Sequence, residues 1–241
     1  MKKLLVLSAM ALCAASVFAD TAAFQFSIYS PGDLMIPWAR SDVKGLRLDL
    51  PYGNNKGDVT GADIGLLGVT QGYFTGCAIS LLNDVGGDVV DSGVVKGFQV
   101  GLLANRTKDL YGFQLGGIVN WNRERTVGAQ FGLFNWDSEF EGLQLGCFNV
   151  MQGNVSGVQL GLGNVLRNET KGLIIGGVNY GVTKVAGAQI GAVNFVEKES
   201  TGVQIGVFNA SQHHTGIQLG LLNINPNGLL PVFPFVNFCF R

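Results

Sequence analysis

One short phrase, GxQxGxxN, recurs nine times between residues 97 and 223, and this repetition constrains the fold more than any other feature. Successive copies begin 14 to 16 residues apart. Self-similarity at a short fixed period is typical of an array in which one structural unit packs on the next, and it disfavours an enzyme built round a single unique pocket. The copies are GFQVGLLAN (97–105), GFQLGGIVN (112–120), GAQFGLFN (128–135), GLQLGCFN (142–149), GVQLGLGN (157–164), GLIIGGVN (172–179), GAQIGAVN (187–194), GVQIGVFN (202–209) and GIQLGLLN (216–223).

Aliphatic residues alternate with glycine and glutamine inside each copy. In 202–209, Val203 and Ile205 alternate with Gln204 and Gly206. Successive residues of a strand point to opposite faces, so this period of two predicts a β-strand with an aliphatic face and a glutamine face. We expect the aliphatic face to be buried, either in a protein core or against lipid. The closing asparagine is the residue expected where a strand enters a turn.

Weaker segments extend the array to fourteen candidate strands. In the segment 45–50 the charged residues Arg47 and Asp49 occupy the glutamine face, and Val232 to Phe240 forms a last alternating stretch. The weaker segments are AFQFSIY (23–29), GLRLDL (45–50), GADIGLLG (61–68), GCAISLLN (76–83) and VFPFVNFCF (232–240).

Two architectures fit these strands. Connectors of six or seven residues are too short for a parallel crossover and favour hairpins, so the first is an antiparallel up-and-down meander that closes as a barrel. Its aliphatic face would meet lipid, and its glutamine face would line a lumen. The alternative is a β-solenoid of stacked repeats with an aliphatic core and with glutamine and asparagine ladders at the outside or the corners. We favour the barrel because of its even strand count and an apparent export signal.

Ten residues are the candidates for lining the polar face. In the barrel we also expect Trp121, Trp136, Tyr180 and Phe195 to lie on the glutamine side. The candidate lining residues are Arg47, Asp49, Gln99, Gln114, Gln130, Gln144, Gln159, Gln189, Gln204 and Gln218.

The N-terminus has the pattern of a secretory signal peptide. Lys2 and Lys3 precede an apolar run that ends at the small-residue site before Asp20, so we expect residues 1–19 to be removed and 20–241 to form a single β-repeat domain. The formal net charge of −1 would become about −3 without the two lysines. This balance excludes a nucleic-acid-binding protein.

Chemical sites are not evident. The adjacent His213 and His214 are expected in a solvated turn, and the loop that carries Asp84, Asp88 and Asp91 matches no calcium-binding spacing. The three cysteines of the mature chain, Cys77, Cys147 and Cys239, lack metal-ligand spacing, although one disulfide between two of them is possible. We therefore expect no catalytic residues, no cofactor and no metal, and hence no enzyme.

The repeats, the export signal and the leading segment DVKGLRLDLPYGNN (42–55) resemble a family of bacterial surface-repeat proteins, known from spirochaetes and other Gram-negative groups, with tandem GxQxGxxN units. The resemblance covers nearly the whole mature chain, except that Ile174 stands where glutamine is expected. It implies export to the outer membrane or cell surface and no assigned activity. We expect a structural or interaction role with envelope components as partners; the alternatives are a channel-like barrel and an adhesin-like ligand-binding protein.

Overall fold

The computed structural model describes residues 21–27, 35–36, 42–86 and 93–240. The expected signal peptide and the loop residues Asp88 and Asp91 lie outside this part of the chain. The structure divides into two compact units, one up to Arg123 and one from Glu124 onward.

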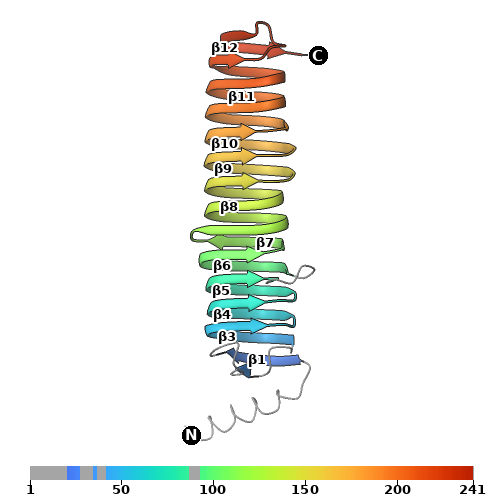
Figure 1. Ribbon diagram of the computed structural model, residues 1–241, viewed down its shortest axis with the longest axis vertical. Coiled ribbons are helices and arrows are strands. Elements are labelled where there is room, and N and C mark those ends of the chain that lie inside the picture. The colour runs from blue at the N-terminus through green and yellow to red at the C-terminus, as the bar shows by residue number, and fades with distance from the viewer. Residues whose placement is uncertain (1–20, 28–34, 37–41, 87–92, 241) are drawn as a thin grey trace, which may run out of the picture. The chain divides into compact units, whose positions relative to one another are not determined.

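The described residues form twelve strands (Figure 1). Fewer strands than the expected fourteen are present because β8 and β11, with 33 and 41 residues, each run without interruption through more than one repeat. The strands are β1 (Thr21–Ser27), β2 (Met35–Ile36), β3 (Asp42–Asn55), β4 (Val59–Thr70), β5 (Phe74–Val85), β6 (Val94–Thr107), β7 (Asp109–Gly116), β8 (Val119–Met151), β9 (Val155–Leu166), β10 (Thr170–Gly181), β11 (Lys184–Ile224) and β12 (Val232–Cys239).

Neighbouring repeats pair in parallel within each unit, and equivalent positions of the phrase face each other. In the first unit, Gly61 of β4 pairs with Gly76 of β5, and Gly76 pairs with Gly97 of β6. Each turn of chain therefore returns to the start of the previous one, one strand spacing further on. This pairing defines a β-solenoid, the alternative architecture, and the expected antiparallel barrel is wrong.

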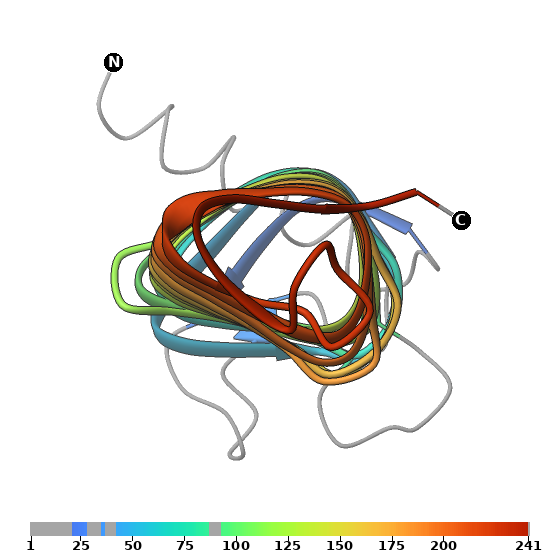
Figure 2. The ribbon, with the colours of Figure 1, turned by 90° about the horizontal axis from the view of Figure 1, so that it is seen from above.

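The second unit follows the same rule with stricter register. Gly142, Gly157, Gly172 and Gly187 pair in succession along β8, β9, β10 and β11. In the view from above, the yellow to red coils of this unit project onto one closed outline (Figure 2). The short connectors do not make hairpins. They carry the chain round the remainder of each coil.

The burial of the two faces is the reverse of what we expected for a solenoid. Gln204 and Asn209 are buried, whereas Ile205 and Val207 are 40% and 55% exposed. The glutamine and asparagine side chains point into the coil, and most aliphatic side chains of the phrase point outward. The two faces do lie opposite each other, as the alternation predicts, but the expectation that the aliphatic face is buried in a protein core is wrong.

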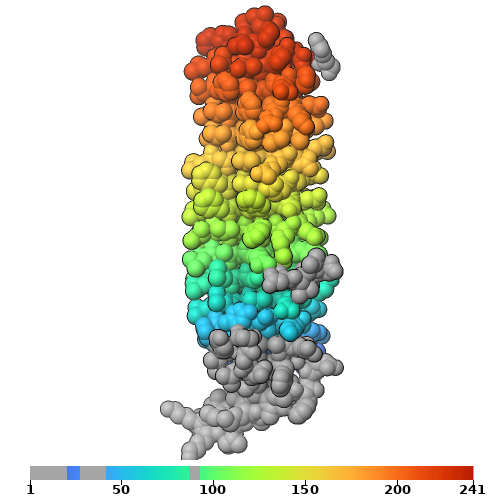
Figure 3. Space-filling model, viewed as in Figure 1, coloured from blue at the N-terminus to red at the C-terminus, as the bar shows by residue number. Residues whose placement is uncertain are grey.

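Most apolar side chains of each interior lie outside the phrase, and the exceptions are Ala78 and Ile174, which take glutamine positions. One cluster of the first unit includes Val59, Phe74 and Leu110, and one cluster of the second includes Phe140 and Leu166. These residues lie two positions before the first glycine or two positions after the asparagine of their repeats. Each coil thus has a polar half and an apolar half inside, and the space-filling view shows the coils of each unit as closely packed layers (Figure 3).

The first glycine of the phrase is required by the stacking of the coils. Gly187 has a φ of 125°, which side-chain-bearing residues rarely adopt. A Cβ atom at this position would also collide with the carbonyl oxygen of Gly172 in the preceding coil. The second glycine has an additional reason: a Cβ on Gly176 would lie 2.7 Å from Asn164 Nδ2 and 2.8 Å from both Asn179 Oδ1 and the carbonyl oxygen of Gly161 in the preceding coil. It leaves space for the asparagine side chains.

The C-terminal segment ends the second unit. Strand β12 pairs antiparallel with the last coil of β11, and it does not pair with β1, as a closed barrel would require. Asn237 is buried, accepts a hydrogen bond from the backbone of Leu229 and donates one to the carbonyl oxygen of Leu230. Strand β12 and the segment before it thereby cover the last coil of the second unit.

The glycine stack predicts a large difference between two Gly→Ala substitutions. Gly187→Ala should lower the free energy of unfolding by about 2–4 kcal/mol, because it adds backbone strain to a collision with rigid backbone. Gly163→Ala should cost under about 1 kcal/mol, since Gly163 lies at an outward position where its nearest neighbour is the Phe148 ring. Urea denaturation of both variants measures the difference. Equal losses would contradict the proposed role of the first glycine.

Candidate functional site: an apolar outer face over buried amide ladders

The asparagines that close the phrases form a ladder inside the second unit. Asn164 Nδ2 donates to Asn179 Oδ1 at 2.8 Å, and Asn179 Nδ2 donates to Asn194 Oδ1 at 2.8 Å. Each amide also donates to a backbone carbonyl of the next coil, as Asn179 does to Ile190 at 3.0 Å. An amide carries both donors and acceptors, so identical residues at one strand spacing satisfy each other. The asparagines therefore join successive coils and do not mark simple turns.

The glutamines form a second ladder that runs in the opposite direction. Gln204 Nε2 donates to Gln189 Oε1 at 2.6 Å, and Gln218 Nε2 donates to Gln204 Oε1 at 2.8 Å. Each glutamine thus donates toward the N-terminus, whereas each asparagine donates toward the C-terminus. The first unit repeats both directions, from Gln114 to Gln99 and from Asn105 to Asn120. The side-chain amide dipoles of the two ladders consequently oppose each other.

The glutamine ladder is interrupted at Ile174 in the second unit. Gln159 Oε1 and Gln189 Nε2, on either side of this coil, are buried without a hydrogen-bond partner among the described residues. They are the acceptor and the donor that a glutamine at position 174 would engage. Ala78 takes the same ladder position in the first unit, and there Gln99 Nε2 is left without a partner. Replacement of a ladder glutamine thus leaves unpaired amide groups in the coil above, below or both.

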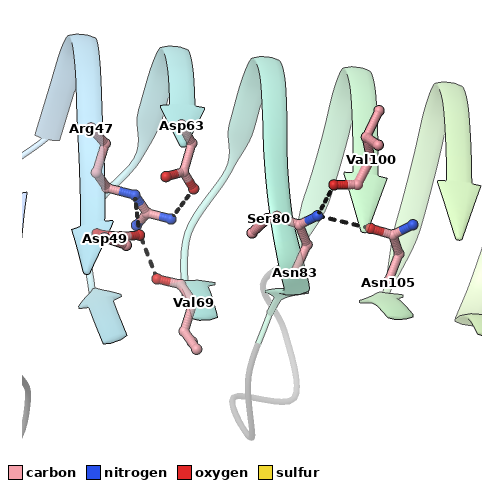
Figure 4. Close-up of polar contacts among 8 residues, drawn as sticks. All are labelled: Arg47, Asp49, Asp63, Val69, Ser80, Asn83, Val100 and Asn105. Carbon is pink, nitrogen blue, oxygen red and sulfur yellow. Dashed lines mark hydrogen bonds and ion pairs between the residues drawn. The ribbon is translucent and has the colours of Figure 1, made fainter. Parts of the chain in front are cut away.

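Charged residues take the place of the amides near the N-terminal end of the first unit. Arg47 lies inside β3, and its guanidinium contacts Asp63 of β4, lies 3.1 Å from Asp49 Oδ2, and donates to the carbonyl oxygen of Val69 at 3.0 Å (Figure 4). The three charged side chains are essentially inaccessible to water. Two carboxyl groups thus share one guanidinium, which leaves the cluster with an excess negative charge when both are ionised.

Burial raises the pKa of Asp49 to about 7; Arg47 opposes the shift and the nearby Asp63 adds to it. Burial by itself would lower the pKa of Arg47, but the attraction of Asp63 and Asp49 outweighs it and the pKa is raised. Asp49 therefore binds its proton in the folded state at pH values where the unfolded chain, with a pKa near 3.8, has lost it. The stability that this proton supplies is lost as the pH rises from about 4 through about 7.

The burial of two polar residues of the second unit was not predicted from the sequence. His214 is buried with its Nδ1 2.6 Å from Ser200 Oγ, so the expected solvated turn is wrong for this residue. Burial lowers the pKa of His214 to about 4, and its protonation opposes folding as the pH falls from 6.5 through this value. Asp137 is also buried and accepts hydrogen bonds from Thr126, Gln130 and Gln144. Alternation within the phrase gives no signal for either residue, since both lie in connectors.

The outward side chains of the phrases form a continuous apolar surface in the second unit, which we call the phrase face. It comprises the second, fourth, sixth and seventh positions of each phrase and the residue after the asparagine, except Ala210, which is buried. No charged residue occupies any of these positions in the seven phrases between 128 and 224. Twelve large side chains of this face are exposed: Leu133, Phe134, Trp136, Phe148, Leu162, Val178, Phe195, Ile205, Val207, Leu219, Leu221 and Leu222.

Equivalent side chains of the phrase face stack from coil to coil. The rings of Phe134 and Phe148 lie 5.4 Å apart, and those of Tyr180 and Phe195 lie 5.8 Å apart and nearly parallel. Trp136 and Phe195 follow the phrase asparagines and are exposed. The expectation that they share the glutamine side is wrong, because two consecutive outward residues shift the alternation before each asparagine.

The C-terminal segment also exposes apolar side chains, among them Phe235 and Phe240. The outer surface formed by the connectors is charged and polar, and we call it the connector face. In the second unit it carries Arg125 and Glu141, paired at 3.0 Å, and Lys184 and Glu199, at 3.9 Å. A shallow hollow of about 300 Å³ lies on this face and is lined by side chains of both signs, among them Glu139 and Lys171. The charged side chains that line this hollow include the ion pair of Arg125 and Glu141, which is exposed to solvent.

The predicted polar-face residues are all buried in the coil interiors. Arg47, Asp49, Gln99 and Gln114 belong to the first unit, where they do not form one site. Gln144, Gln159, Gln189, Gln204 and Gln218 belong to the second unit and, with Gln130, lie in one column. Cys77, Cys147 and Cys239 are free thiols. The part of the chain that the structure describes contains no group of metal-ligating side chains close enough to hold an ion.

No family model, curated protein or solved structure matches this chain. Among the described residues, no helix has the length and apolar character needed to cross a membrane.

The interrupted ladder predicts that Ile174→Gln stabilises the second unit. The new amide can bond both unpaired groups, each of which costs about 1–3 kcal/mol, and this gain should exceed the loss of one buried isoleucine. We expect a net increase of about 1–3 kcal/mol in the free energy of unfolding. The matched substitution Gln204→Ile should destabilise by a similar amount, since it interrupts an intact ladder. Chemical denaturation compares the three proteins, and a less stable Ile174→Gln protein would refute the ladder energetics.

The charged cluster predicts a pH-dependent effect of Asp49→Asn. The variant cannot ionise at this position, so its stability relative to the parent protein should increase as the pH rises from about 4 to about 7 and then remain constant. Urea midpoints at pH 5 and pH 8 measure this difference. Glu139→Gln, which alters an exposed carboxylate of the second unit, is the control and should show no such trend. An advantage for Asp49→Asn that is greatest at the acidic end would contradict the raised pKa.

Proposed function

We propose that this chain is a non-enzymatic, exported β-solenoid of the bacterial cell envelope. It has a structural role and binds envelope components through the phrase face. One observation carries the proposal: the repeats place their amides inside and their aliphatic side chains outside. A water-soluble protein of this size ordinarily uses such aliphatic side chains for its core, and extended apolar patches are typical of interaction surfaces.

The polar residues give little support to a catalytic or small-ligand function. The amide groups of Asn179 and Asn194 are occupied by hydrogen bonds to neighbouring coils and lie away from solvent. The same holds for Gln204 in the glutamine ladder. These groups hold coils together and are not free to bind a sugar, a peptide or a substrate. The adhesin-like alternative therefore lacks a specific polar site on the phrase face.

The N-terminal sequence and the resemblance to surface-repeat proteins support an envelope location. Both point to export, and an exported solenoid with an extensive apolar surface would be poorly soluble unless that surface were covered. A repeat protein suits such a role, because each additional coil adds equivalent outward residues to the same surface. Coverage by envelope components accounts for the absence of charge along the seven phrases.

The test is fractionation of cells that express the full chain in a Gram-negative host. The threonine variant combines Leu133→Thr, Leu162→Thr, Val207→Thr and Leu221→Thr, four exposed positions at which threonine is compatible with a strand. The control variant combines Glu139→Thr, Lys171→Thr, Lys198→Thr and Glu199→Thr on the connector face, and it leaves the net charge unchanged. Parent and control should sediment with the envelope in high salt, whereas the threonine variant should be released as a folded protein.

Two results would contradict the proposal. One is a parent protein that is recovered in the soluble fraction, and the other is a threonine variant that is retained as well as the control. Circular dichroism of the purified variants establishes that each keeps its β-structure, because the substituted side chains are outward and take no part in the amide ladders.

A further inference from the structure

We infer that the phrase face of the second unit lies in the surface of a lipid bilayer, with its aliphatic columns among the acyl chains and the aromatic residues along one border at the level of the headgroups. The inference rests on the proposed function and names the partner of the same surface. Three features of the face distinguish lipid from a protein partner: its curvature, its borders and the charges beside it.

The phrase face is larger than an isolated apolar patch on a soluble monomer. Its twelve exposed side chains together present on the order of 1,000 Å² of apolar surface, which exceeds the few hundred Å² usual for such patches. An area of this size would also suffice for a stable protein interface, so the extent alone does not identify the partner.

The face bends around the coil. Leu133 and Phe134 are consecutive residues and both are exposed, and the same is true of Leu221 and Leu222. In a straight strand, neighbouring side chains point to opposite faces, so the chain must turn at each of these pairs. The apolar columns before and after the turn consequently face different directions. A second copy or another rigid protein could cover one side of this bend, whereas fluid acyl chains can cover both.

The borders of the face match the layers of a bilayer surface. Along one border, three of the seven positions after the asparagines carry aromatic residues, Trp136, Tyr180 and Phe195, and the other four carry aliphatic ones. Tryptophan and tyrosine favour the interface between hydrocarbon and water. Along the other border, the residue before each phrase glycine is often polar or charged, as in Glu141, Ser156 and Thr201. The apolar surface is therefore limited on both sides by groups that can meet headgroups or water.

The charged residues beside the phrase face indicate whether binding requires anionic lipid headgroups. Among its described residues the second unit carries seven acidic side chains against five basic ones, and two of these five, Arg125 and Lys184, lie by Glu141 and Glu199. A surface that binds anionic lipid headgroups instead carries clusters of uncompensated lysine or arginine. Burial of apolar side chains must then drive the association, so zwitterionic lipid should suffice and salt should have little effect.

Vesicle binding of the purified full chain tests the inference directly. The probe is a vesicle of zwitterionic phosphatidylcholine and phosphatidylethanolamine, and binding is measured by flotation. In a protein whose other tryptophans are replaced by phenylalanine, the fluorescence of Trp136 should shift to the blue and be quenched by lipids brominated in their acyl chains. Anionic lipid and added salt should change the partition coefficient less than about twofold.

The threonine variant should lower the partition coefficient at least tenfold, and the control variant should leave it within about twofold of the parent value. Failure of the parent to float with zwitterionic vesicles would overturn the inference, as would undiminished binding by the threonine variant. A lipid-free dimer in which Trp136 is already shielded would overturn it in favour of a second copy. If vesicle binding fails while the parent remains with the envelope in cells, the proposed function stands and only the lipid assignment falls.

Discussion

Hydrogen bonding between identical amide side chains, one coil apart, is the interaction on which each unit depends. An unpaired buried amide is costly, but a column of amides at strand spacing satisfies its donors and acceptors internally. Asn179 and Gln204 each bond to the equivalent residue of a neighbouring coil. This arrangement allows amide side chains to fill part of the coil interior, provided that the coils stay in register. The stacked glycines favour that register, because Gly187 lies directly against the backbone of Gly172 in the preceding coil and a side chain there would collide with it.

The polar interior has a direct consequence for the outside. A strand has two faces, so a phrase that uses its glutamines and asparagines to join coils must turn its aliphatic residues outward. The resulting surface is held by rigid backbone and is apolar along its whole extent in the second unit. The same residues thus provide cohesion on one side of the strand and an interaction surface on the other, which links the fold to the function that we propose.

Departures from the repeat show how much the ladders constrain each coil. Ile174 leaves one unpaired group on each side, and this defect is confined to two neighbouring glutamines. Replacement of two amides by Arg47 and Asp63 instead places a compact charged cluster inside the first unit, where Asp49 gains a pKa of about 7. The stability of that region therefore depends on pH, whereas the stability of an amide ladder does not, because amide side chains do not ionise.

The sequence by itself determined the repeat period, the all-β character, and the opposition of aliphatic and glutamine faces. It did not determine which face is inside, because alternation defines two faces without an orientation, and aliphatic residues ordinarily make the core. Nor did the connectors between phrases distinguish a hairpin from the remainder of a coil, since both need few residues. Only the tertiary structure decided these points: parallel stacking brings each amide beside its equivalent, and the paired outward residues, such as Leu221 and Leu222, turn the asparagine inward.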